Sequence, residues 1–317
     1  MKNVLVTGGC GFIGSAFLNY MLPKYPEVRF INLDKLDYCA REKNVMTRDN
    51  YVFEKGDICD SLKVITVLNQ YNIDTVVHFA AYSHVDNSFN NSVNFTVNNV
   101  VGTHKLLEAC RVWNRITKFI HVSTDEVYGE IEHGGTFQEK NAILSPTNPY
   151  AASKAAAEMI VNGYKKSFKM PIIITRGNNV YGPRQYPEKL IPKFILNMFN
   201  GEPCPIHGSG VNVRNFIHCE DVARAFETIL LKGRVGHVYN IGSDDEYSVM
   251  QVAEHLQRII RPRTAQFIKV EDRPFNDIRY AIDVTKLKDL GWTQEIEWEK
   301  GLKNTVEWYA DNSDWFN

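Results

Sequence analysis

Short apolar runs alternate with stretches of helical spacing through the first half of the chain, and this alternation limits the possible folds most strongly. Several runs are apolar at successive positions, as expected for strands of a parallel sheet that helices cover on both faces. Between them, residues 61–70 and 102–112 have the spacing of helices. The alternation predicts an α/β fold with a doubly wound parallel sheet. The predicted strands are residues 4–6, 30–33, 51–53, 75–79, 119–122 and 172–175.

Turn residues interrupt this alternation after about Gly177, where asparagine, glycine and proline cluster. Residues 223–231 and 238–241 still have the pattern of a helix and a strand that return to the sheet. A length of 317 residues corresponds to about two domains. We therefore expect a nucleotide-binding domain from residues 1–178 plus about 218–244, and a smaller substrate-binding α/β lobe from about 179–217 plus 245–317.

Composition excludes several classes of function. Thirty-six Lys and Arg balance thirty-seven Asp and Glu, so no broad basic surface is expected and nucleic acid is not the predicted partner. No apolar run reaches the roughly 20 residues that span a bilayer, and the N-terminus does not have the pattern of a signal peptide. The six cysteines are scattered without a C-x-x-C pair, which predicts no metal site and a cytoplasmic protein.

A glycine turn follows the first predicted strand and opens a helix. Gly8, Gly11 and Gly14 are spaced as G-x-x-G-x-x-G, with Phe12 and Ile13 between the last two. Such glycines turn the chain sharply, let the backbone approach a pyrophosphate and allow close packing of helix on strand. A structural turn without a ligand is the alternative. The position of the turn after a strand favours a dinucleotide site in a Rossmann fold.

Acidic residues at the ends of the next two strands extend this prediction. Asp34 lies twenty residues beyond Gly14, where a carboxylate accepts hydrogen bonds from the adenine ribose. It would repel a 2′-phosphate, so the cofactor is predicted to be NAD and not NADP, although Lys35 weakens this preference. Asp57 follows the third strand and could accept from the adenine amino group.

Tyr150 and Lys154 begin a helix predicted to run to about Phe168. Positions i and i+4 share one helix face, so the phenol and the ammonium point the same way. A nearby cation favours the phenolate of a tyrosine, which is otherwise a poor base. The alternative is a surface tyrosine beside a solvated lysine. Thr124, at the end of the fifth predicted strand, completes a set that resembles the short-chain dehydrogenases/reductases.

The resemblance extends over nearly the whole chain and points to the extended branch of that superfamily, specifically to the nucleotide-sugar 4,6-dehydratases. Its strongest marker is the segment 121–129, His-Val-Ser-Thr-Asp-Glu-Val-Tyr-Gly. Sugar 4-epimerases share the strand end but lack the adjacent Asp125-Glu126 pair. The resemblance implies that Thr124 holds the substrate hydroxyl while Tyr150 removes its proton. It also implies that Glu126 takes the C5 proton and Asp125 protonates the C6 oxygen.

The family pattern implies further contacts for NAD and for a nucleotide-diphosphate sugar. Arg214 and Arg273 are the predicted diphosphate clamps, since a guanidinium binds phosphate oxygens in a bidentate manner. The implied cofactor contacts, besides those named above, are Ile58, Ala80, Ala81, Asn98, Tyr150 and Lys154. The implied substrate contacts are Ser83, Thr124, Asn179, Lys189, Leu190, Pro205, His207, Arg214, Arg273 and Asn276.

Details of the pattern bear on the nucleotide. Arg273-Pro-Phe-Asn-Asp277 and Asp86-Asn-Ser-Phe89 resemble the UDP-glucose 4,6-dehydratase domain of plant rhamnose synthases. We therefore expect dehydration of UDP-glucose in deoxysugar or rhamnose biosynthesis, with dTDP-glucose as the near alternative. A sugar 4-epimerase and a cofactor-sensing regulator without turnover are two further hypotheses for a chain of this fold. The resemblance also implies a homodimer formed through the helices 102–112 and 150–168.

Overall fold

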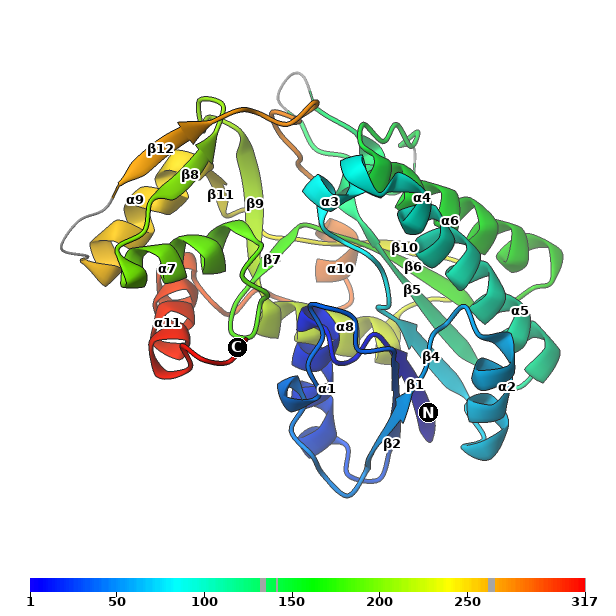
Figure 1. The fold of residues 1–317 in the computed structure, drawn as a ribbon. Coiled ribbons are helices and arrows are strands. Elements are labelled where there is room, and N and C mark those ends of the chain that lie inside the picture. Colours follow the sequence, from blue (N-terminus) through cyan, green and yellow to red (C-terminus); the bar gives the residue numbers. More distant parts are fainter. Residues whose placement is uncertain (132–134, 141, 262–265, 317) are drawn as a thin grey trace.

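The computed structural model describes residues 1–131, 135–140, 142–261 and 266–316. Its centre is a seven-stranded sheet in which every neighbouring pair of strands is parallel (Figure 1). The strand order reverses beside β1, as in a Rossmann fold. The predicted doubly wound fold is therefore confirmed. In spatial order the strands are β10 (Val238–Ile241), β6 (Ile172–Gly177), β5 (Lys118–Thr124), β4 (Thr75–His78), β1 (Asn3–Thr7), β2 (Arg29–Asp34) and β3 (Tyr51–Lys55).

Helices cover both faces of this sheet, and successive side chains of one strand enter different cores. Val4 and Val6 pack with α1 and α8, whereas Leu5 packs with α2, α5 and α6. Each strand position is thus buried, which explains the apolar runs without alternation. The helices are α1 (Phe12–Lys24) and α8 (Cys219–Lys232) on one face, and α2 (Ser61–Gln70), α5 (Gly102–Trp113) and α6 (Pro149–Ser167) on the other.

A second lobe lies beside the carboxyl edge of the large sheet (Figure 1). It has its own core, in which Phe194, Leu256 and Leu302 bring three helices together. Its strands are β7 (Asn179–Tyr181), β9 (Val213–His218) and β11 (Glu246–Ser248) in one sheet, and β8 (Cys204–His207) with β12 (Phe267–Val270) in another. Its helices are α7 (Leu190–Asn200), α9 (Val249–Ile260) and α11 (Trp298–Asp311).

Short elements connect these layers. These elements are η1 (Glu42–Asn44), α3 (Val85–Asn90), α4 (Ser92–Phe95), the π-helical turn η2 (Thr96–Val101), η3 (Asp125–Tyr128) and α10 (Thr285–Lys288). Three of them, α3, η2 and η3, carry residues that line the cavities between the two parts. The segment before α5, η2, winds as a π-helical turn, a form often found at functional sites.

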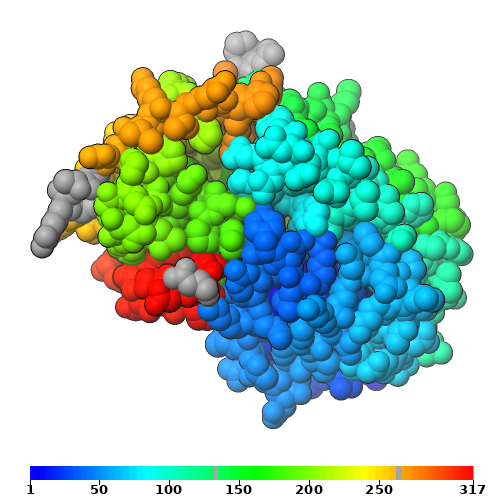
Figure 2. Space-filling view, viewed as in Figure 1, coloured from blue at the N-terminus to red at the C-terminus, as the bar shows by residue number. Residues whose placement is uncertain are grey.

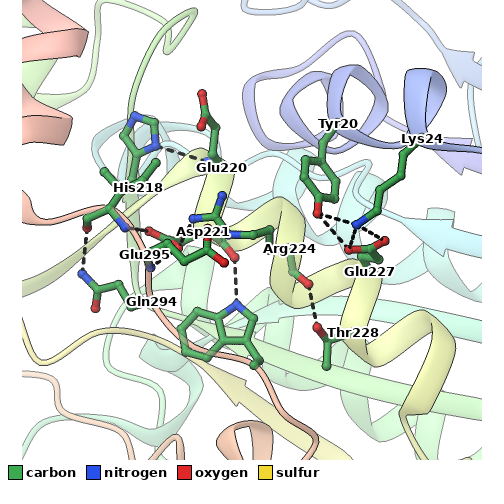
Figure 3. A network of polar contacts seen from close by, with 12 residues as sticks. Tyr20, Lys24, His218, Glu220, Asp221, Arg224, Glu227, Thr228, Gln294 and Glu295 are labelled. Atoms are coloured by element: carbon green, nitrogen blue, oxygen red, sulfur yellow. Dashed lines mark hydrogen bonds and ion pairs between the residues drawn. The ribbon is translucent and has the colours of Figure 1, made fainter.

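Helix α8, which covers the large sheet, binds the segment just before α11 through polar contacts (Figure 3). The buried carboxylate of Asp221 accepts hydrogen bonds from the backbone N–H of Glu295 at 2.8 Å and of Ile296 at 3.1 Å. Leu287 and Trp292 pack in the same core as α1 and α8. This corrects the predicted boundary, since residues around 285–292 pack with the nucleotide-binding domain and not with the lobe.

The remaining division into two interleaved domains is our proposal. Among the helices of the described residues, none is both long and apolar enough to cross a membrane. Within the same ranges, no group of three or more His, Cys, Asp or Glu side chains is arranged to hold a metal ion.

Candidate active site

The first cavity begins at the glycine turn between β1 and α1. Gly8 has a φ of +73°, and a Cβ at this position would lie 2.6 Å from the backbone nitrogen of Ala80. A Cβ on Gly14 would lie 2.4 Å from the carbonyl oxygen of Gly8. Gly11 is the N-cap of α1 and provides no side-chain acceptor for the first amides of the helix. The turn therefore fits a pyrophosphate group.

Asp34 ends β2 at the same cavity and is buried. Its Oδ2 accepts a hydrogen bond from the backbone N–H of Cys10 at 2.9 Å, and its Oδ1 accepts one from Leu36 at 2.8 Å. Burial raises the pKa of Asp34, while these two hydrogen bonds act in the opposite direction. Each oxygen retains a lone pair, so the carboxylate fits the hydroxyls of an adenine ribose.

Lys35 does not offer an unpaired cation to a ribose phosphate. Its Nζ donates to the hydroxyl of Tyr82 at 2.9 Å and to Oδ1 of Asn98 at 3.0 Å. It also lies 3.3 Å from a carboxylate oxygen of Asp37 and 3.6 Å from one of Asp57. The local balance of charge is negative, which supports a preference for NAD over NADP.

The structure brings together every residue predicted to contact the cofactor. All of them line one cavity at the carboxyl edge of the sheet. They are Gly8, Gly11, Phe12, Ile13, Gly14, Asp34, Lys35, Asp57, Ile58, Ala80, Ala81, Asn98, Tyr150 and Lys154.

Two carboxyl groups and a hydroxyl follow directly on the end of β5. Asp125 is 3% exposed, and its Oδ1 lies 3.2 Å from Oγ1 of Thr124. Burial, together with the charge of Glu126, raises the pKa of Asp125 to about 7. Burial also raises the pKa of Glu126. Both carboxyls therefore have the perturbed pKa that acid–base catalysis at neutral pH requires.

Each of these carboxyl groups accepts a hydrogen bond from an asparagine that the sequence analysis did not select. Nδ2 of Asn178 donates to Oδ2 of Asp125 at 2.7 Å. Nδ2 of Asn148 donates to Oε2 of Glu126 at 2.9 Å. The Asn148-Pro149 pair could have been recognised as an N-cap followed by proline at the first helical position. No local pattern signals the contact of Asn178.

Tyr150 and Lys154 lie in the first turns of α6 and are both buried. Burial raises the pKa of Tyr150, as does the charge of Glu126. Nζ of Lys154 donates to the carbonyl oxygen of Val122 at 2.6 Å, and burial lowers its pKa to about 8. The ammonium is therefore bound to the end of the strand, and stabilisation of the phenolate by this lysine stays a prediction.

A second cavity adjoins the first and lies between the two parts of the chain. Glu126 lines both cavities, and so do Ser83, Asn179 and Lys189. Thr124 lines only the first. The other predicted substrate contacts line the second cavity, and these are Leu190, Pro205, His207, Arg214, Arg273 and Asn276.

The two arginines of this cavity are held in different ways. Nη2 of Arg214 donates to Oδ1 of Asn276 at 3.2 Å, and its guanidinium lies 4.7 Å from the ring centre of Tyr280. Nε of Arg273 lies 2.6 Å from Oδ1 of Asp86. Both guanidiniums are thus oriented by the protein itself at a cavity that can hold a diphosphate.

Further contacts join the two sides of the cleft. The hydroxyl of Tyr38 donates to Oε2 of Glu188 at 2.8 Å, and Nζ of Lys189 donates to the carbonyl oxygen of Ser83 at 2.7 Å. Figure 2 shows the N-terminal part in blue and cyan meeting the lobe in yellow-green on this face. These two contacts therefore bridge the cleft where the two cavities join.

Comparison with known proteins identifies the family. The model of the GDP-mannose 4,6-dehydratase family matches residues 5–305. A trifunctional UDP-glucose 4,6-dehydratase, 3,5-epimerase and reductase of Arabidopsis thaliana is 53% identical over 99% of this chain. The chain spans about half the length of that relative, 48%. The human dTDP-D-glucose 4,6-dehydratase is 48% identical, and the alignment covers 98% of this chain and 91% of that protein.

A solved structure agrees with this assignment. The dTDP-glucose 4,6-dehydratase of Bacillus anthracis, in complex with NAD, is 40% identical and superposes with a TM-score of 0.92. The alignment covers 99% of this chain and 98% of that chain. The predicted family is thereby confirmed, and the predicted cofactor, NAD, is the one bound in this neighbour. The chain belongs to the GDP-mannose 4,6-dehydratase family of nucleotide-sugar dehydratases, built on the extended short-chain dehydrogenase/reductase fold.

Proposed function

We propose that the protein converts UDP-glucose to UDP-4-keto-6-deoxyglucose with NAD as a bound cofactor, and that dTDP-glucose is the alternative substrate. The observation that carries this proposal is the position of Glu126. It lines both the cofactor cavity and the substrate cavity, beside the buried carboxyl of Asp125. Two carboxyls at that junction provide the acid and the base that elimination of water requires.

The first step is oxidation of the sugar at C4. Thr124 and Tyr150 line the cofactor cavity together, so we assign them to the C4 hydroxyl, with Tyr150 removing its proton. The carbonyl of Val122 holds the ammonium of Lys154 near the end of β5, and burial lowers the pKa of this lysine to about 8. Bound NAD supplies the acceptor for the C4 hydride and later returns that hydride to C6.

The second step is elimination across C5 and C6. The 4-ketone acidifies the C5 proton, which Glu126 takes as general base. Asp125 donates its proton to the C6 oxygen, which leaves as water when the C5–C6 double bond forms. A pKa of about 7 keeps a large part of Asp125 protonated at neutral pH. Return of the hydride to C6 and of a proton from Glu126 to C5 removes this double bond, so no net oxidation results and the reaction needs no added reductant.

The lobe binds the nucleotide. We assign the diphosphate to Arg214 and Arg273, with Ser83, Asn179 and Lys189 where the cavities join. Leu190, Pro205, His207 and Asn276 line the same cavity, where we place the nucleoside and the sugar diphosphate. The 53% identity to the plant enzyme that acts on UDP-glucose supports UDP-glucose. The 48% identity to the human enzyme named for dTDP-glucose supports the alternative.

A 4-epimerase is the second candidate. It would use the same oxidation at C4 but would not need an acid and a base at C5 and C6. The buried Asp125-Glu126 pair, with both pKa values raised, therefore favours the dehydratase.

One experiment separates these candidates. The purified protein is incubated with UDP-glucose and with dTDP-glucose, and the alkali-induced absorbance of a 4-keto-6-deoxy sugar is followed. We expect product from both, with the higher kcat/KM for UDP-glucose. Formation of UDP-galactose without any keto sugar would contradict the dehydratase and support the epimerase.

We also propose a cytoplasmic homodimer that packs through α5 and α6. Several large apolar side chains are exposed on α6, just after its end and on the turn before α5. Val101 is 40% exposed, Met159 is 54% exposed and Phe168 is 51% exposed. Light scattering should give a dimer for the wild type and a monomer for Met159→Glu, whereas a wild-type monomer would contradict this proposal.

A further inference from the structure

We propose that Asn178 and Asn148 are positioning residues, each of which occupies one oxygen of one catalytic carboxyl and leaves the other oxygen for the chemistry. Asp125 then carries its transferable proton on Oδ1, and Glu126 accepts the C5 proton on Oε1. This inference rests on the proposed dehydratase function and adds the two residues that assign the acid and the base to single atoms.

The contact of Asn178 selects one oxygen of Asp125. Nδ2 of Asn178 donates to Oδ2 at 2.7 Å, and an oxygen that accepts such a bond is a poor position for a proton. The proton of the neutral acid therefore sits on Oδ1. Oγ1 of Thr124 donates to that oxygen at 3.2 Å, on the side of the cofactor cavity. Because a hydroxyl can also accept, this contact can reverse when Oδ1 carries the proton, whereas the NH₂ group of Asn178 can only donate. The acid is thus aimed at the side of the site where the sugar hydroxyls must lie.

The end of β10 holds the backbone of Asn178, whose side-chain Oδ1 is buried without a hydrogen-bond partner among the described residues. The backbone N–H of Asn178 donates to the carbonyl oxygen of Ile241 at 2.9 Å. A Cβ on the following residue, Gly242, would lie 2.0 Å from Oδ1 of Asn178. The absence of a side chain at Gly242 therefore creates the space that the buried amide occupies.

The contact of Asn148 selects one oxygen of Glu126 in the same way. Nδ2 of Asn148 donates to Oε2 at 2.9 Å, which leaves the lone pairs of Oε1 for a proton. Oδ1 of Asn148 accepts the backbone N–H of Ala151 at 2.9 Å as the N-cap of α6. Because that partner is always a donor, the amide cannot turn over, and its NH₂ group must face Glu126. The residue that starts the helix of Tyr150 therefore also orients the base.

A neutral amide suits this role better than a cation. An adjacent Arg or Lys would hold the carboxyl as a permanent anion, whereas an amide orients it and leaves its raised pKa largely intact. The charged and titratable groups that face Asp125 are Glu126, Tyr150 and Arg214. Those that face Glu126 are Asp125, Tyr150, Lys189, Arg214, Asp277 and Tyr280.

Two variants and one matched control test the inference. Asn178→Ala removes the donor to Asp125, and Asn148→Ser removes the donor to Glu126 but keeps a side chain that caps helices well. Asn215→Ala is the control, since Asn215 is also buried and donates Nδ2 to a carbonyl, at 3.0 Å, but lines neither cavity. Circular dichroism and bound NAD show whether each variant folds.

The variants should separate the steps of the reaction. In Asn178→Ala, loss of water slows about 10- to 100-fold and reduced nicotinamide accumulates, because C4 oxidation continues while the acid is misplaced. The pKa of Asp125 rises without its donor, so the alkaline limb of kcat moves to higher pH. In Asn148→Ser, exchange of the C5 proton with deuterated water slows about 10- to 100-fold. Asn215→Ala should show none of these effects.

Other results would overturn the inference. Unchanged rates and pH profiles in both variants, or an equal loss of every step including C4 oxidation in correctly folded protein, would show that the asparagines do not position the carboxyls. If Asn178→Ala fails to fold, Asn178→Ser, which keeps a small polar group, is measured in its place. A wild-type protein that forms no keto sugar would overturn the proposed function together with this inference, whereas normal turnover in the variants overturns the inference alone.

Discussion

Nε of Arg273 lies 2.6 Å from Oδ1 of Asp86, and this ion pair joins the substrate lobe to α3 across the cleft. Nη2 of Arg273 also donates to Oδ2 of Asp86 at 3.3 Å. Burial raises the pKa of Asp86, but the charge and hydrogen bond of Arg273 outweigh it and lower the pKa. The arginine assigned to the diphosphate is therefore oriented before the substrate arrives.

Replacement of this arginine should weaken binding of the nucleotide sugar without loss of cofactor. In Arg273→Ala we expect KM to rise about 10- to 100-fold, since a charge-assisted contact to phosphate is lost, while bound NAD stays at the wild-type level. The control is Arg279→Ala. Arg279 is 29% exposed like Arg273 and pairs with Glu246 at 2.5 Å, but it lines neither cavity. An equal rise of KM in both variants would contradict the assigned role.

The phenol of Tyr150 should be required for the first chemical step. Tyr150→Phe is expected to lower the rate of C4 oxidation by about 10²- to 10⁴-fold, so that little reduced nicotinamide or keto sugar forms. Tyr164→Phe is the control, because Tyr164 is also 8% exposed and lies on the same helix, with its hydroxyl bound to Glu108. Stopped-flow absorbance of reduced nicotinamide measures the rate of C4 oxidation in both variants. Rapid oxidation in Tyr150→Phe would exclude the tyrosine as the base.

The glycine turn should tolerate no side chain at Gly14. A Cβ there would lie 2.4 Å from a backbone oxygen, so Gly14→Ala should displace the turn and yield protein without bound NAD. Gly163 provides the opposite case, since no atom lies within 4 Å of a Cβ at that helical position. Gly163→Ala should raise the free energy of unfolding by about 0.5–1 kcal/mol and leave NAD content unchanged. Full NAD content in Gly14→Ala would contradict the cofactor assignment.

The raised pKa of Asp125 predicts a pH-dependent cost in stability. The folded pKa is about 7 against 3.8 for an ordinary aspartate, so folded protein retains this proton between those values while unfolded protein loses it. Stability from this group is present below pH 3.8 and is lost as pH rises to about 7. The Asp125→Asn variant has no ionisable group at this position, so it does not lose this stability as pH rises.

Asp125→Asn should therefore become more stable relative to wild type as pH rises from about 4 to 7, by ~3 kcal/mol in total, and the difference should then stay constant. Urea unfolding at several pH values measures this difference. The same variant should lose dehydration activity. A stability difference that does not change with pH would show that the pKa of Asp125 is not raised in the folded protein.

Local pattern was sufficient to predict the sheet and the cofactor cavity. The first strand is one apolar run, Val4-Leu5-Val6, and its side chains are buried in two cores on opposite faces of the sheet. The glycine turn and the acid at Asp34 were predictable for a similar reason, because a strand, a turn and a helix in direct succession have few arrangements.

Contacts between distant segments could not be predicted in this way. The predicted lobe included Leu287 and Trp292, but both pack in the core of α1 and α8. An apolar side chain does not itself indicate in which of two cores it packs. Lys154 shares a helix face with Tyr150 as expected, yet its ammonium is bound by the carbonyl of Val122. Helical spacing determines the face of a side chain but not the partner that a neighbouring strand offers to it.

Residues that are neighbours along one strand or one helix were enough to predict the doubly wound sheet, the dinucleotide turn and the kinds of side chain at the site. Which amide binds which carboxyl depends instead on how the elements pack. Asn148 and Asn178 reach Glu126 and Asp125 only because α6 and the end of β6 converge on the end of β5. That convergence results from the order of strands and the packing of helices, which no single segment encodes.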